Sequence, residues 1–446
     1  MGLLEQIFQA GIVGAGGAGF PTHKKLAPGG GEPPDTLLIN AAECEPLLAS
    51  DRYAMRHFAT EIAEALALLK TEFRFSRVAI GTKKKYAAEI AALKAALSAI
   101  GAEAEICGLD SFYPAGDEQV LAYEVTGRTV PPGGIPLEVG IVVLNVTTAL
   151  AVGAASRGIP VTEKYVTVTG EVAEPAIVRA PVGASVADCI AAAGGPRVTP
   201  YAIVKGGPMM GKQHGMSEAD SLCIGKADGG IVLLPAAHPL IEFAKKPREH
   251  MLNQAKSVCM QCSCCTELCP RYLIGHRIRP SRVMRSMATG TGDADLSDAL
   301  LCCECGLCEL HACPMLLSPR RVNAYVKELL RAKGARVSDR TVRPEQAELR
   351  GYRRVAQSRL ISRLSLSAYP AHIDRLAICR PATVRVPLKH GPGRPASPLV
   401  KPGDSVRAGD AIAGVAFEDV GCMVHASISG TVSEVGASDI AIVGGG

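Results

Sequence analysis

The chain has 446 residues, of which 48% are hydrophobic and 20% are charged, and its formal net charge is +5. This length predicts two to four domains, and the apolar content indicates a globular protein rather than a disordered one. The small charge, the lack of Trp and an aromatic content of 4% argue against a nucleic-acid-binding surface. The longest nearly apolar stretch, residues 140–155, is too short to cross a membrane, and no signal peptide is visible. We therefore expect a cytoplasmic protein without a membrane span.

The N-terminal stretch GIVGAGGAGFPTHKKL contains the dinucleotide-binding spacing GxGxxG at Gly14, Gly16 and Gly19. A Rossmann loop requires a buried strand before the glycines and a helix directly after them. Residues 3–9 instead have the apolar spacing of a helix, and Pro21 follows the glycines. The stretch therefore predicts another kind of glycine loop, whose exposed backbone can approach a flat or anionic group.

The next part of the chain alternates predicted strands with predicted helices. Residues 36–43, 77–85 and 102–108 are typical of strands, and residues 56–70 and 87–100 are typical of helices. This alternation predicts an α/β domain with a mainly parallel sheet. Three consecutive lysines, Lys83 to Lys85, either meet a nucleotide phosphate or lie in a solvated turn.

The composition and the predicted secondary structure of the remaining chain change three times. Residues 161–235 are rich in short predicted strands with one short helical piece, and residues from 382 onward predict a small all-β module. Between them, residues 318–363 contain thirteen Lys or Arg and four Asp or Glu. This basic segment is either a solvated helical face or a surface that docks an acidic partner.

Sixteen cysteines are unusual for a chain of this kind, and ten of them lie between residues 259 and 313. In a cytoplasmic protein they indicate metal binding or catalysis rather than disulfides. The first run has the spacing C-x2-C-x2-C-x3-C-P and comprises Cys259, Cys262, Cys265 and Cys269. The second has the spacing C-x2-C-x2-C-x4-C-P and comprises Cys302, Cys305, Cys308 and Cys313.

Two such runs are typical of a two-cluster ferredoxin, in which the last cysteine of each run binds the cluster of the other run. We expect one [4Fe–4S] cluster on Cys259, Cys262, Cys265 and Cys313, and a second on Cys269, Cys302, Cys305 and Cys308. The alternative is zinc, which prefers well-separated CxxC pairs. Cys264 and Cys303 do not fit the spacing and are predicted non-ligands, and the x4 gap before Cys313 departs from the usual x3.

The sequence AGGAGFPTHKKL resembles the flavin-binding loop of the NADH-oxidising subunit of respiratory complex I, and it is more similar still to RnfC-like proteins. Residues 40–55, NAAECEPLLASDRYAM, and residues 113–152 resemble the next two segments of that family, in the same order. Residues 161–235 resemble the SLBB domain, a β-grasp unit. The chain is thus identified as a member of this flavin and iron–sulfur family along nearly its whole length.

The resemblance implies sites for FMN and for NADH as the electron donor. The flavin loop maps onto Gly14, Gly16, Gly17, Gly19 and Phe20, and its lysine maps onto Lys25, which suits the FMN phosphate. The later segments map onto Asn40, Glu43, Glu45, Tyr113, Gly116, Asp117, Glu118 and Asn145. Of these, Glu43, Glu45 and Glu118 are the predicted catalytic residues. Ala42 stands where the complex I segment has an aspartate, which affects the expected hydrogen bonds.

The C-terminal sequence VKPGDSVRAGDAIA resembles the turn of a biotinyl- or lipoyl-type barrel sandwich. Such modules carry a prosthetic group on a lysine, but Lys401 is the last lysine of the chain, so we expect docking or packing instead. In RnfC proteins this module precedes the flavin loop, whereas here it comes last. That order is similar to the cobalamin reductases of propanediol-utilisation microcompartments.

The resemblance therefore implies NADH-dependent electron transfer through FMN and two clusters to a corrinoid or a corrinoid-dependent enzyme. It also implies a location inside a bacterial microcompartment or at its shell proteins. One alternative is an RnfC-like subunit of a membrane ion-translocating complex that exchanges electrons between NADH and ferredoxin. Another is a non-catalytic iron–sulfur electron carrier.

The expected architecture has five parts. They are an α/β FMN- and NADH-binding domain (1–155), an SLBB β-grasp domain (160–236), an α-helical two-cluster ferredoxin-like domain (248–320), a basic helical linker (321–378) and an all-β barrel sandwich (380–446).

Overall fold

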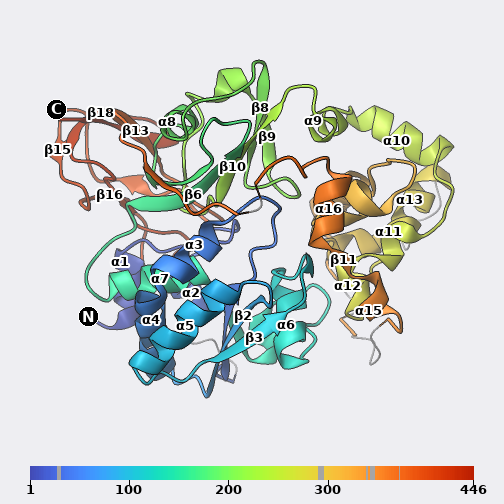
Figure 1. Cartoon of the computed structure of the whole chain (residues 1–446), viewed down its shortest axis with the longest axis horizontal. Helices are drawn as coiled ribbons and strands as arrows, with labels where there is room; N and C mark the ends of the chain where they lie inside the picture. Colours follow the sequence, from blue (N-terminus) through green and yellow to red (C-terminus); the bar gives the residue numbers. More distant parts are fainter. Residues whose placement is uncertain (28–31, 290–295, 338–339, 342–346, 371, 446) are drawn as a thin grey trace.

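The computed structural model describes all residues except 28–31, 290–295, 338–339, 342–346, 371 and 446. The chain passes from an N-terminal α/β part through a mixed β-sheet and a helical part to a C-terminal β part, which lies beside the N-terminus (Figure 1). Within the described ranges, no helix has the length and apolar character needed to cross a membrane.

The first part is a parallel four-stranded sheet in the order β3-β2-β1-β5. Its strands are β1 (Thr36–Ala41), β2 (Arg77–Lys83), β3 (Glu105–Leu109) and β5 (Ile141–Asn145). Its main helices are α1 (Leu3–Gln9), α3 (Ser50–His57), α4 (Ala59–Glu72), α5 (Ala87–Ala99), α6 (Glu118–Thr126) and α7 (Val146–Ala155). The predicted α/β domain is confirmed, although the single helix predicted over 56–70 is split between α3 and α4.

Both faces of this sheet are covered, as is usual for parallel strands. Leu37 and Ile39 of β1 pack into a core with α1, α4, α5 and α7. Leu38 points to the opposite face, where Val120 and Leu121 of α6 cover it. Because neighbouring strand residues serve different cores, the strands are apolar throughout rather than alternating.

The second part is a six-stranded mixed sheet in the order β12-β7-β6-β10-β8-β9. Five strands come from the predicted β-rich region: β6 (Glu163–Gly170), β7 (Ala176–Pro181), β8 (Tyr201–Lys205), β9 (Lys212–Gly215) and β10 (Gly230–Pro235). The edge strand β12 (Leu376–Ile378) arrives from much later in the sequence and pairs in parallel with β7. Helix α8 (Val186–Ala192) covers one face of the sheet.

The cysteine-rich part is made of short helices. They are α9 (Pro239–Ala244), α10 (Arg248–Ser257), α11 (Cys264–Glu267), α12 (Pro270–Leu273), α13 (Pro280–Thr289) and α14 (Pro319–Ala332). Helices α10, α13 and α14 share a small apolar core that includes Val283, Val322 and Val326.

The basic segment folds onto its own chain. After α14 come α15 (Arg350–Arg353), the two-residue strand β11 (Val355–Ala356) and α16 (Gln357–Arg363). Strand β11 pairs antiparallel with β4 (Phe112–Tyr113) of the first part.

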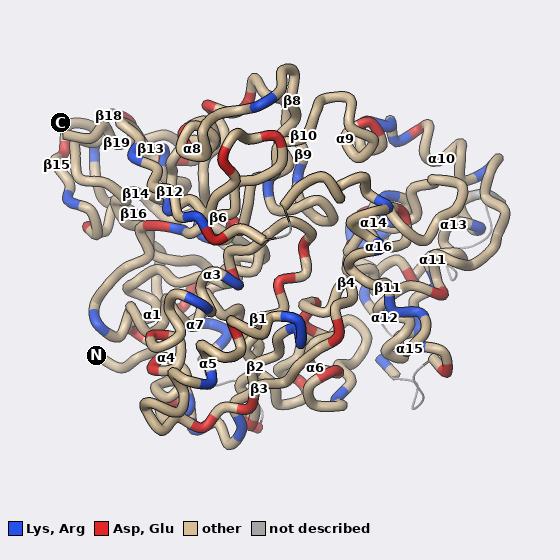
Figure 2. The backbone as a smooth tube through the Cα atoms, in the orientation of Figure 1, with Lys and Arg blue, Asp and Glu red and all other residues tan. Residues whose placement is uncertain are grey.

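The segment's arginines form ion pairs with acids of this chain: Arg320 with Glu309, Arg340 with Glu138, Arg350 with Glu124, Arg353 with Glu267, and Arg354 with Asp110. Figure 2 shows the blue and red positions side by side in this region. Much of the segment's charge is therefore neutralised within the molecule instead of facing solvent or a separate acidic partner.

The C-terminal part consists of two antiparallel sheets, in the orders β13-β19-β18-β15 and β14-β16-β17. Its strands are β13 (Thr383–Pro387), β14 (Ser397–Pro398), β15 (Ser405–Val406), β16 (Ala411–Gly414), β17 (Val424–His425), β18 (Gly430–Val435) and β19 (Asp439–Gly444). Apolar side chains from both sheets form one core. The predicted all-β module is confirmed.

This module packs against the start of the chain. The fully buried Lys226 donates hydrogen bonds from Nζ to the carbonyl oxygens of Gly11, at 2.8 Å, and of Met423, at 2.7 Å. The backbone of His390 lies so close to Gly19 that a Cβ on this glycine would be 2.0 Å from the His390 oxygen. The glycine stretch near the N-terminus is therefore held by the last module of the chain.

Candidate functional site

The predicted site residues gather at the carboxyl ends of the parallel strands. Asn40 is near the end of β1 and Asn145 ends the adjacent β5. This edge is where ligands bind in open α/β sheets. The fold thus places the two asparagines where the resemblance requires them.

The glycine loop (residues 14–20) closes on itself and leans on helix α7. Its ends are joined by a hydrogen bond from the Gly14 N–H to the Phe20 oxygen, at 2.8 Å, and the Ala15 N–H donates to Oγ1 of Thr148 at 2.9 Å. A Cβ on Gly16 would lie 3.7 Å from Cβ of Asn145. Gly17 has φ +101° with no atom within 4 Å of its Cβ position, so the loop presents bare backbone to open space. Such a cradle fits a flat or anionic group.

Asn40 and Gly116 connect two of the predicted segments. Nδ2 of Asn40 donates to the Gly116 oxygen at 2.7 Å, and its Oδ1 accepts from the Ala42 N–H at 3.2 Å. A Cβ on Gly116 would be 3.2 Å from Sγ of Cys44, so this position accommodates little beyond glycine. Ala42 is fully buried, and its N–H is satisfied by Asn40 without help from an aspartate side chain.

The partly buried Glu43 and the buried Asp51 form an acidic pair next to Asn145. The Asp51 N–H donates to Oε2 of Glu43, and Nδ2 of Asn145 donates to Oδ2 of Asp51, both at 2.8 Å. Burial and the charge of Asp51 raise the pKa of Glu43 well above its ordinary value, and burial raises the pKa of Asp51 to about 6. The site therefore contains carboxyl groups that can hold a proton near neutral pH.

Glu45, a predicted catalytic residue, faces the second sheet part. Its Oε2 accepts from the Met209 N–H at 2.9 Å, and its Oε1 accepts from the Met210 N–H at 3.0 Å. A Cβ on Gly207 would be 2.6 Å from Oε2 of Glu45. Both carboxylate oxygens are thus engaged by one loop of the second sheet. Burial raises the pKa of Glu45 to about 7.

The predicted segment around residues 113–118 joins the sheet edge to the cysteine-rich part. Nζ of Lys25 and Oε1 of Glu118 form an ion pair at 2.7 Å close to the glycine loop. Asp117 caps α6 by accepting the N–H groups of Gln119 and Val120, and pairs with Arg271 at 2.8 Å.

Tyr113 provides the most direct link between the two parts. Its buried hydroxyl donates to the backbone oxygen of Cys305 at 2.7 Å. The contact is between an expected flavin-site segment and an expected cluster ligand, so the two sites are neighbours.

The pKa values of several expected cluster cysteines are influenced by other cysteines of the same predicted group. Burial raises the pKa of Cys265 to about 12, and the charges of Cys313, Cys259 and Cys262 add to the shift. These four are the first thiol group. Burial likewise raises the pKa of Cys308, and the charges of Cys302 and Cys269 add to the shift. The hydrogen bond with Cys303 raises the pKa of Cys305, and burial and the charges of Cys269 and Cys308 raise it further. Cys269, Cys302, Cys305 and Cys308 are the second thiol group.

The local backbone supports this arrangement. Gln261, Ser263 and Glu304, which stand between the cysteines, have φ values of +55°, +61° and +59°, a strained region for residues other than glycine. The Glu304 N–H donates to Sγ of Cys302, and the Leu317 N–H donates to Sγ of Cys313, both at 3.4 Å. Tight loops, thiols and N–H···S bonds are the donor chemistry that an iron–sulfur cluster requires. Within the described parts of the chain, no three His, Cys, Asp or Glu side chains are arranged to hold a single metal ion.

The families that match the chain follow the order of these parts. The Nuo51 FMN-binding domain matches residues 7–154, the SLBB domain residues 165–213, the 4Fe-4S dicluster domain residues 258–318, and the RnfC barrel sandwich hybrid domain residues 371–444. The cobalamin reductase PduS of Citrobacter freundii is 38% identical over 445 residues, which cover 99% of this chain and 96% of the relative. The chain belongs to the PduS cobalamin reductase family.

More distant relatives share only part of this organisation. One belongs to the proton-translocating ferredoxin:NAD(+) oxidoreductase complex of Clostridium ljungdahlii and is 34% identical over 61% of this chain and 56% of its own length. A crystal structure of an NAD+-reducing [NiFe]-hydrogenase in the H2-reduced state has a TM-score of 0.51 and 21% identity, covering 76% of this chain and 68% of its own. The hydrogenase likeness shows a shared fold.

Several residues of the site were not identified from the sequence. The environment of Lys83 was not predicted: it is fully buried and donates from Nζ to the backbone oxygen of Glu43, at 2.7 Å, and to Oε1 of Gln357, at 2.9 Å, so it does not lie in a solvated turn. Arg271 and Asp51 were also missed. Asp51 lies within the quoted segment 40–55, where its charge next to Glu43 was the available signal. Arg271 directly follows the proline of the first cysteine run and carries no comparable signal.

Proposed function

We propose that the chain is an NADH-dependent reductase that uses FMN and two [4Fe–4S] clusters to deliver electrons to a corrinoid. The proposal is supported by the likeness to cobalamin reductase over 99% of the chain. The observation that carries it is the Tyr113 contact, since it joins a segment expected to bind the flavin to Cys305 of the second thiol group. When bound, FMN converts the two electrons of a hydride into single electrons, which [4Fe–4S] clusters can carry.

The flavin assignment uses bare backbone and one cation. Gly14, Gly16, Gly17 and Gly19 provide the backbone cradle, with Phe20 at its rim, 38% exposed. Lys25 provides a positive charge at the same edge, and its pairing with Glu118 keeps it oriented. Asn40 fixes the carbonyl of Gly116, and Asn145 closes the side nearest Gly16.

The three predicted acids have separate roles in this proposal. Glu43 holds a proton beside the strand ends because burial and Asp51 favour its neutral form. Glu118 is the more exposed acid and sets the position of Lys25. Glu45 positions the loop of the second sheet through its two backbone hydrogen bonds, and we assign it no contact with the reacting atoms.

The cluster assignment keeps the crossed pattern of the two cysteine runs. Cys259, Cys262, Cys265 and Cys313 would hold one cluster, and Cys269, Cys302, Cys305 and Cys308 the other. Burial raises the pKa of Cys265 and of Cys308, so iron binding must displace the protons of these thiols. Cys264 and Cys303 remain proposed non-ligands.

The partners and the location are the finer part of the proposal. The relative's name, cobalamin reductase, supports a corrinoid acceptor. A place inside a bacterial microcompartment, with a shell protein as a further partner, is proposed from the resemblance in domain order. Co-fractionation of the chain with microcompartment shells, compared with a strain that lacks shell proteins, tests the location. An RnfC-like role has less support, because the ion-translocating relative matches only 61% of the chain.

Anaerobic purification followed by an acceptor screen tests the function. The expected preparation contains FMN and about eight iron atoms per chain, and it reduces cobalamin with NADH. NADH-dependent reduction of ferredoxin but not cobalamin would favour the RnfC-like alternative. A preparation that holds both clusters but does not oxidise NADH would indicate a simple electron carrier.

A further inference from the structure

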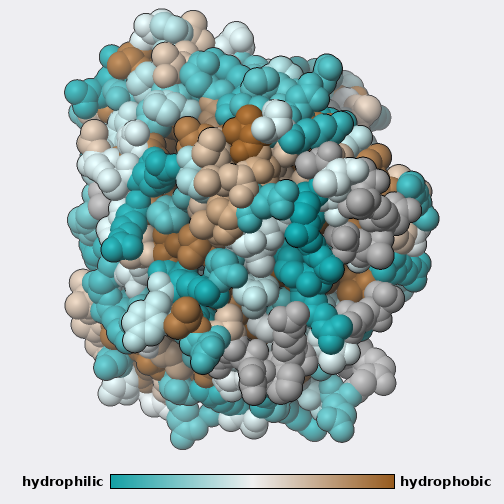
Figure 3. All heavy atoms as spheres, turned by 90° about the vertical axis from the view of Figure 1, so that its right-hand side faces the viewer, coloured by the Kyte–Doolittle hydropathy of each residue, from teal (hydrophilic) through white to brown (hydrophobic). Residues whose placement is uncertain are grey.

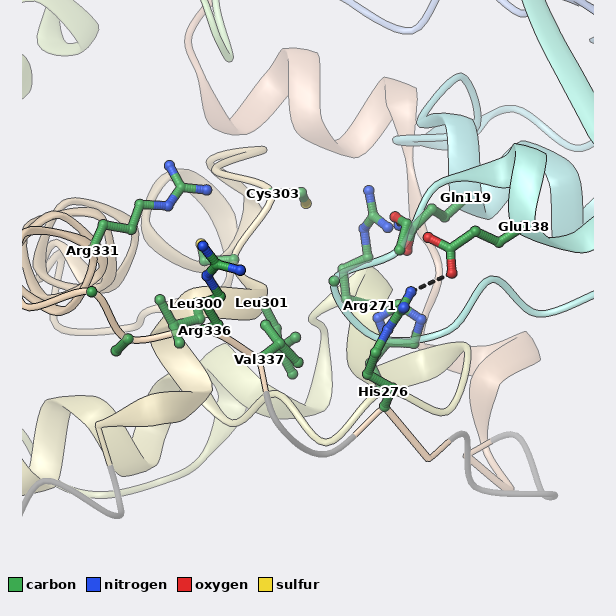
Figure 4. Close-up of a pocket in the computed structure, with 16 residues that line it drawn as sticks. Gln119, Glu138, Arg271, His276, Leu300, Leu301, Cys303, Arg331, Arg336 and Val337 are labelled. Atoms are coloured by element: carbon green, nitrogen blue, oxygen red, sulfur yellow. Dashed lines mark hydrogen bonds and ion pairs between the residues drawn. The ribbon is translucent and has the colours of Figure 1, made fainter. Parts of the chain in front are cut away.

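A cavity of about 710 Å³ lies between the first part and the cysteine-rich part. One wall comes from Gln119 of α6 and the loop at Gly133 and Gly134, and the other from residues 300–303 and the chain that follows α14. Figure 4 shows side chains from both parts pointing into the same space. Its volume and its position between two domains are typical of small-molecule sites.

The inner wall contains two buried polar atoms without a partner. Nε of Arg271 and Oε1 of Gln119 are buried atoms that make no hydrogen bond, and both residues are largely buried. Nη2 of Arg271 donates to Asp117, and Nε2 of Gln119 donates to the Gly134 oxygen. Buried polar groups are rarely left unpaired. A molecule in the cavity would therefore accept one hydrogen bond and donate another.

Two exposed arginines stand across the cavity from this wall. Arg331 and Arg336 line it (Figure 4), and their side chains form no hydrogen bond or ion pair with any described residue. Arg340 also lines the cavity, but it is paired with Glu138. Three guanidinium groups thus surround the space, and two of them have no partner among the described residues. This arrangement favours a phosphate or another oxyanion as the ligand.

The cavity also borders the second thiol group. Cys302 and Cys303 are part of its lining, and Cys302 is one of the proposed cluster ligands. A molecule bound there would lie next to an electron carrier, without a protein layer between them.

We propose that this cavity binds the phosphate-bearing part of the small-molecule electron acceptor, by the chemistry of a ribose phosphate. The phosphate accepts hydrogen bonds from the arginines, and a hydroxyl group donates to Oε1 of Gln119. This chemistry is present in the nucleotide arm of cobalamin and in free adenine nucleotides. The inference rests on the proposed function, since it names where that acceptor binds.

The test uses the cluster-loaded protein with a variant that removes both unpaired charges, Arg331→Gln with Arg336→Gln. Lys333→Gln is the matched control, because Lys333 is an exposed base between them that does not line the cavity. We expect the KM for cobalamin to rise about tenfold or more with kcat little changed, as expected for lost charge-assisted hydrogen bonds. The KM for cobinamide, which lacks the nucleotide arm, should not change in either variant.

Direct binding distinguishes the sources of the phosphate. Equilibrium binding of ADP and of cobalamin is measured on the same variants, with flavin and iron content as controls for folding. Weaker ADP binding with unchanged cobalamin binding would identify a free nucleotide as the occupant and would overturn the assignment of the cavity to the electron acceptor. Unchanged binding of both would overturn the proposal. If the unmodified protein reduces no corrinoid, the proposed function fails, whereas the ADP measurement still decides the cavity.

Discussion

Gly17 is the residue on which flavin binding depends most directly. At φ +101° it adopts a conformation that side chains strongly disfavour, and the space beside it is open. Gly17→Val should therefore expel FMN, both by backbone strain and by filling the cradle. The cysteine-rich part is untouched, so iron content and reduction by dithionite should be normal while NADH no longer bleaches the clusters.

The matched control for this variant is Gly101→Val. Gly101 also has a positive φ, +64°, and an open Cβ side, but it lies in a turn after α5. Gly101→Val imposes similar backbone strain away from the site, so the flavin content of this variant should stay normal. Flavin retention with normal NADH bleaching in Gly17→Val would return the loop to a structural role.

The raised pKa of Glu43 predicts that the stability of the protein depends on pH. Its pKa is raised in the folded protein, so the folded state binds a proton that the unfolded state has already released. The stability that this carboxyl contributes is present below its unfolded value, 4.5, and is lost as the pH rises toward the folded pKa. Glu43→Gln cannot ionise, so its urea midpoint relative to the unmodified protein should increase as the pH rises above 4.5.

The exposed acid Glu118 gives the comparison for this measurement. Glu118→Gln removes a surface ion pair with Lys25 and should show no such increase with pH. An equal pH response in the two variants would show that burial of Glu43 is not the cause.

At this scale the sequence predicts the residues of the site better than their partners. Asn40 lies beside Gly116 and, in the strand register, beside Asn145 at the strand ends, and the roles of these residues toward FMN stay predictions. The partners of Glu45 and Lys83 were not predicted because they lie in parts of the chain distant in sequence. Burial of a charged side chain depends on which segments pack over it, and no local pattern records that.

Strand β11 shows the same limit for elements. The strands and helices of the first sheet were predictable because long apolar runs and helical spacing are local signals. By contrast, Val355 and Ala356 pair with Phe112 and Tyr113, which lie far away in the sequence. A strand of two residues is too short to show a periodic pattern. The prediction for this segment used only the number of its arginines. In the fold, arginines of the segment form ion pairs with acids of the first part.

The segment's attachment can be tested at Gln357, the first residue of α16. Its Oε1 accepts from Nζ of Lys83, whose pKa burial lowers to about 8. Gln357→Leu should leave this buried amine with one acceptor fewer and destabilise the protein by about 1–3 kcal/mol. Thermal unfolding of the variant is compared with Gln9→Leu, which removes an exposed amide bonded to Glu5. Equal midpoints in the two variants would contradict the role of Gln357.

For the molecule as a whole, the two thiol groups have different surroundings. The second group contacts the first part through Tyr113 and Cys305. The first group lies further along the cysteine-rich part, where Cys262 is exposed together with Met260 and Met315. The face that this part contributes is mainly hydrophilic, with scattered hydrophobic residues (Figure 3). We expect electrons to reach the second group first.

Cysteine variants test this order. Cys262→Ala should lose one cluster and leave NADH-dependent bleaching of the other, whereas Cys305→Ala should lose the cluster nearest the flavin and with it NADH reduction of the remaining one. Iron content, dithionite reduction and NADH reduction are measured on each. Cys264→Ala is the control and should keep all its iron. Equal iron loss in Cys264→Ala and Cys262→Ala would show that the ligand register is wrong.

The contact between Gly19 and His390 has a consequence for how the protein is made. Domains generally fold in the order in which they leave the ribosome, yet the glycine loop is synthesised first and receives its support from residues near the other end of the chain. The loop can reach its final form only after translation has finished. Flavin loading should therefore be a late, post-translational event, and a ribosome-bound chain arrested before residue 380 should contain no FMN.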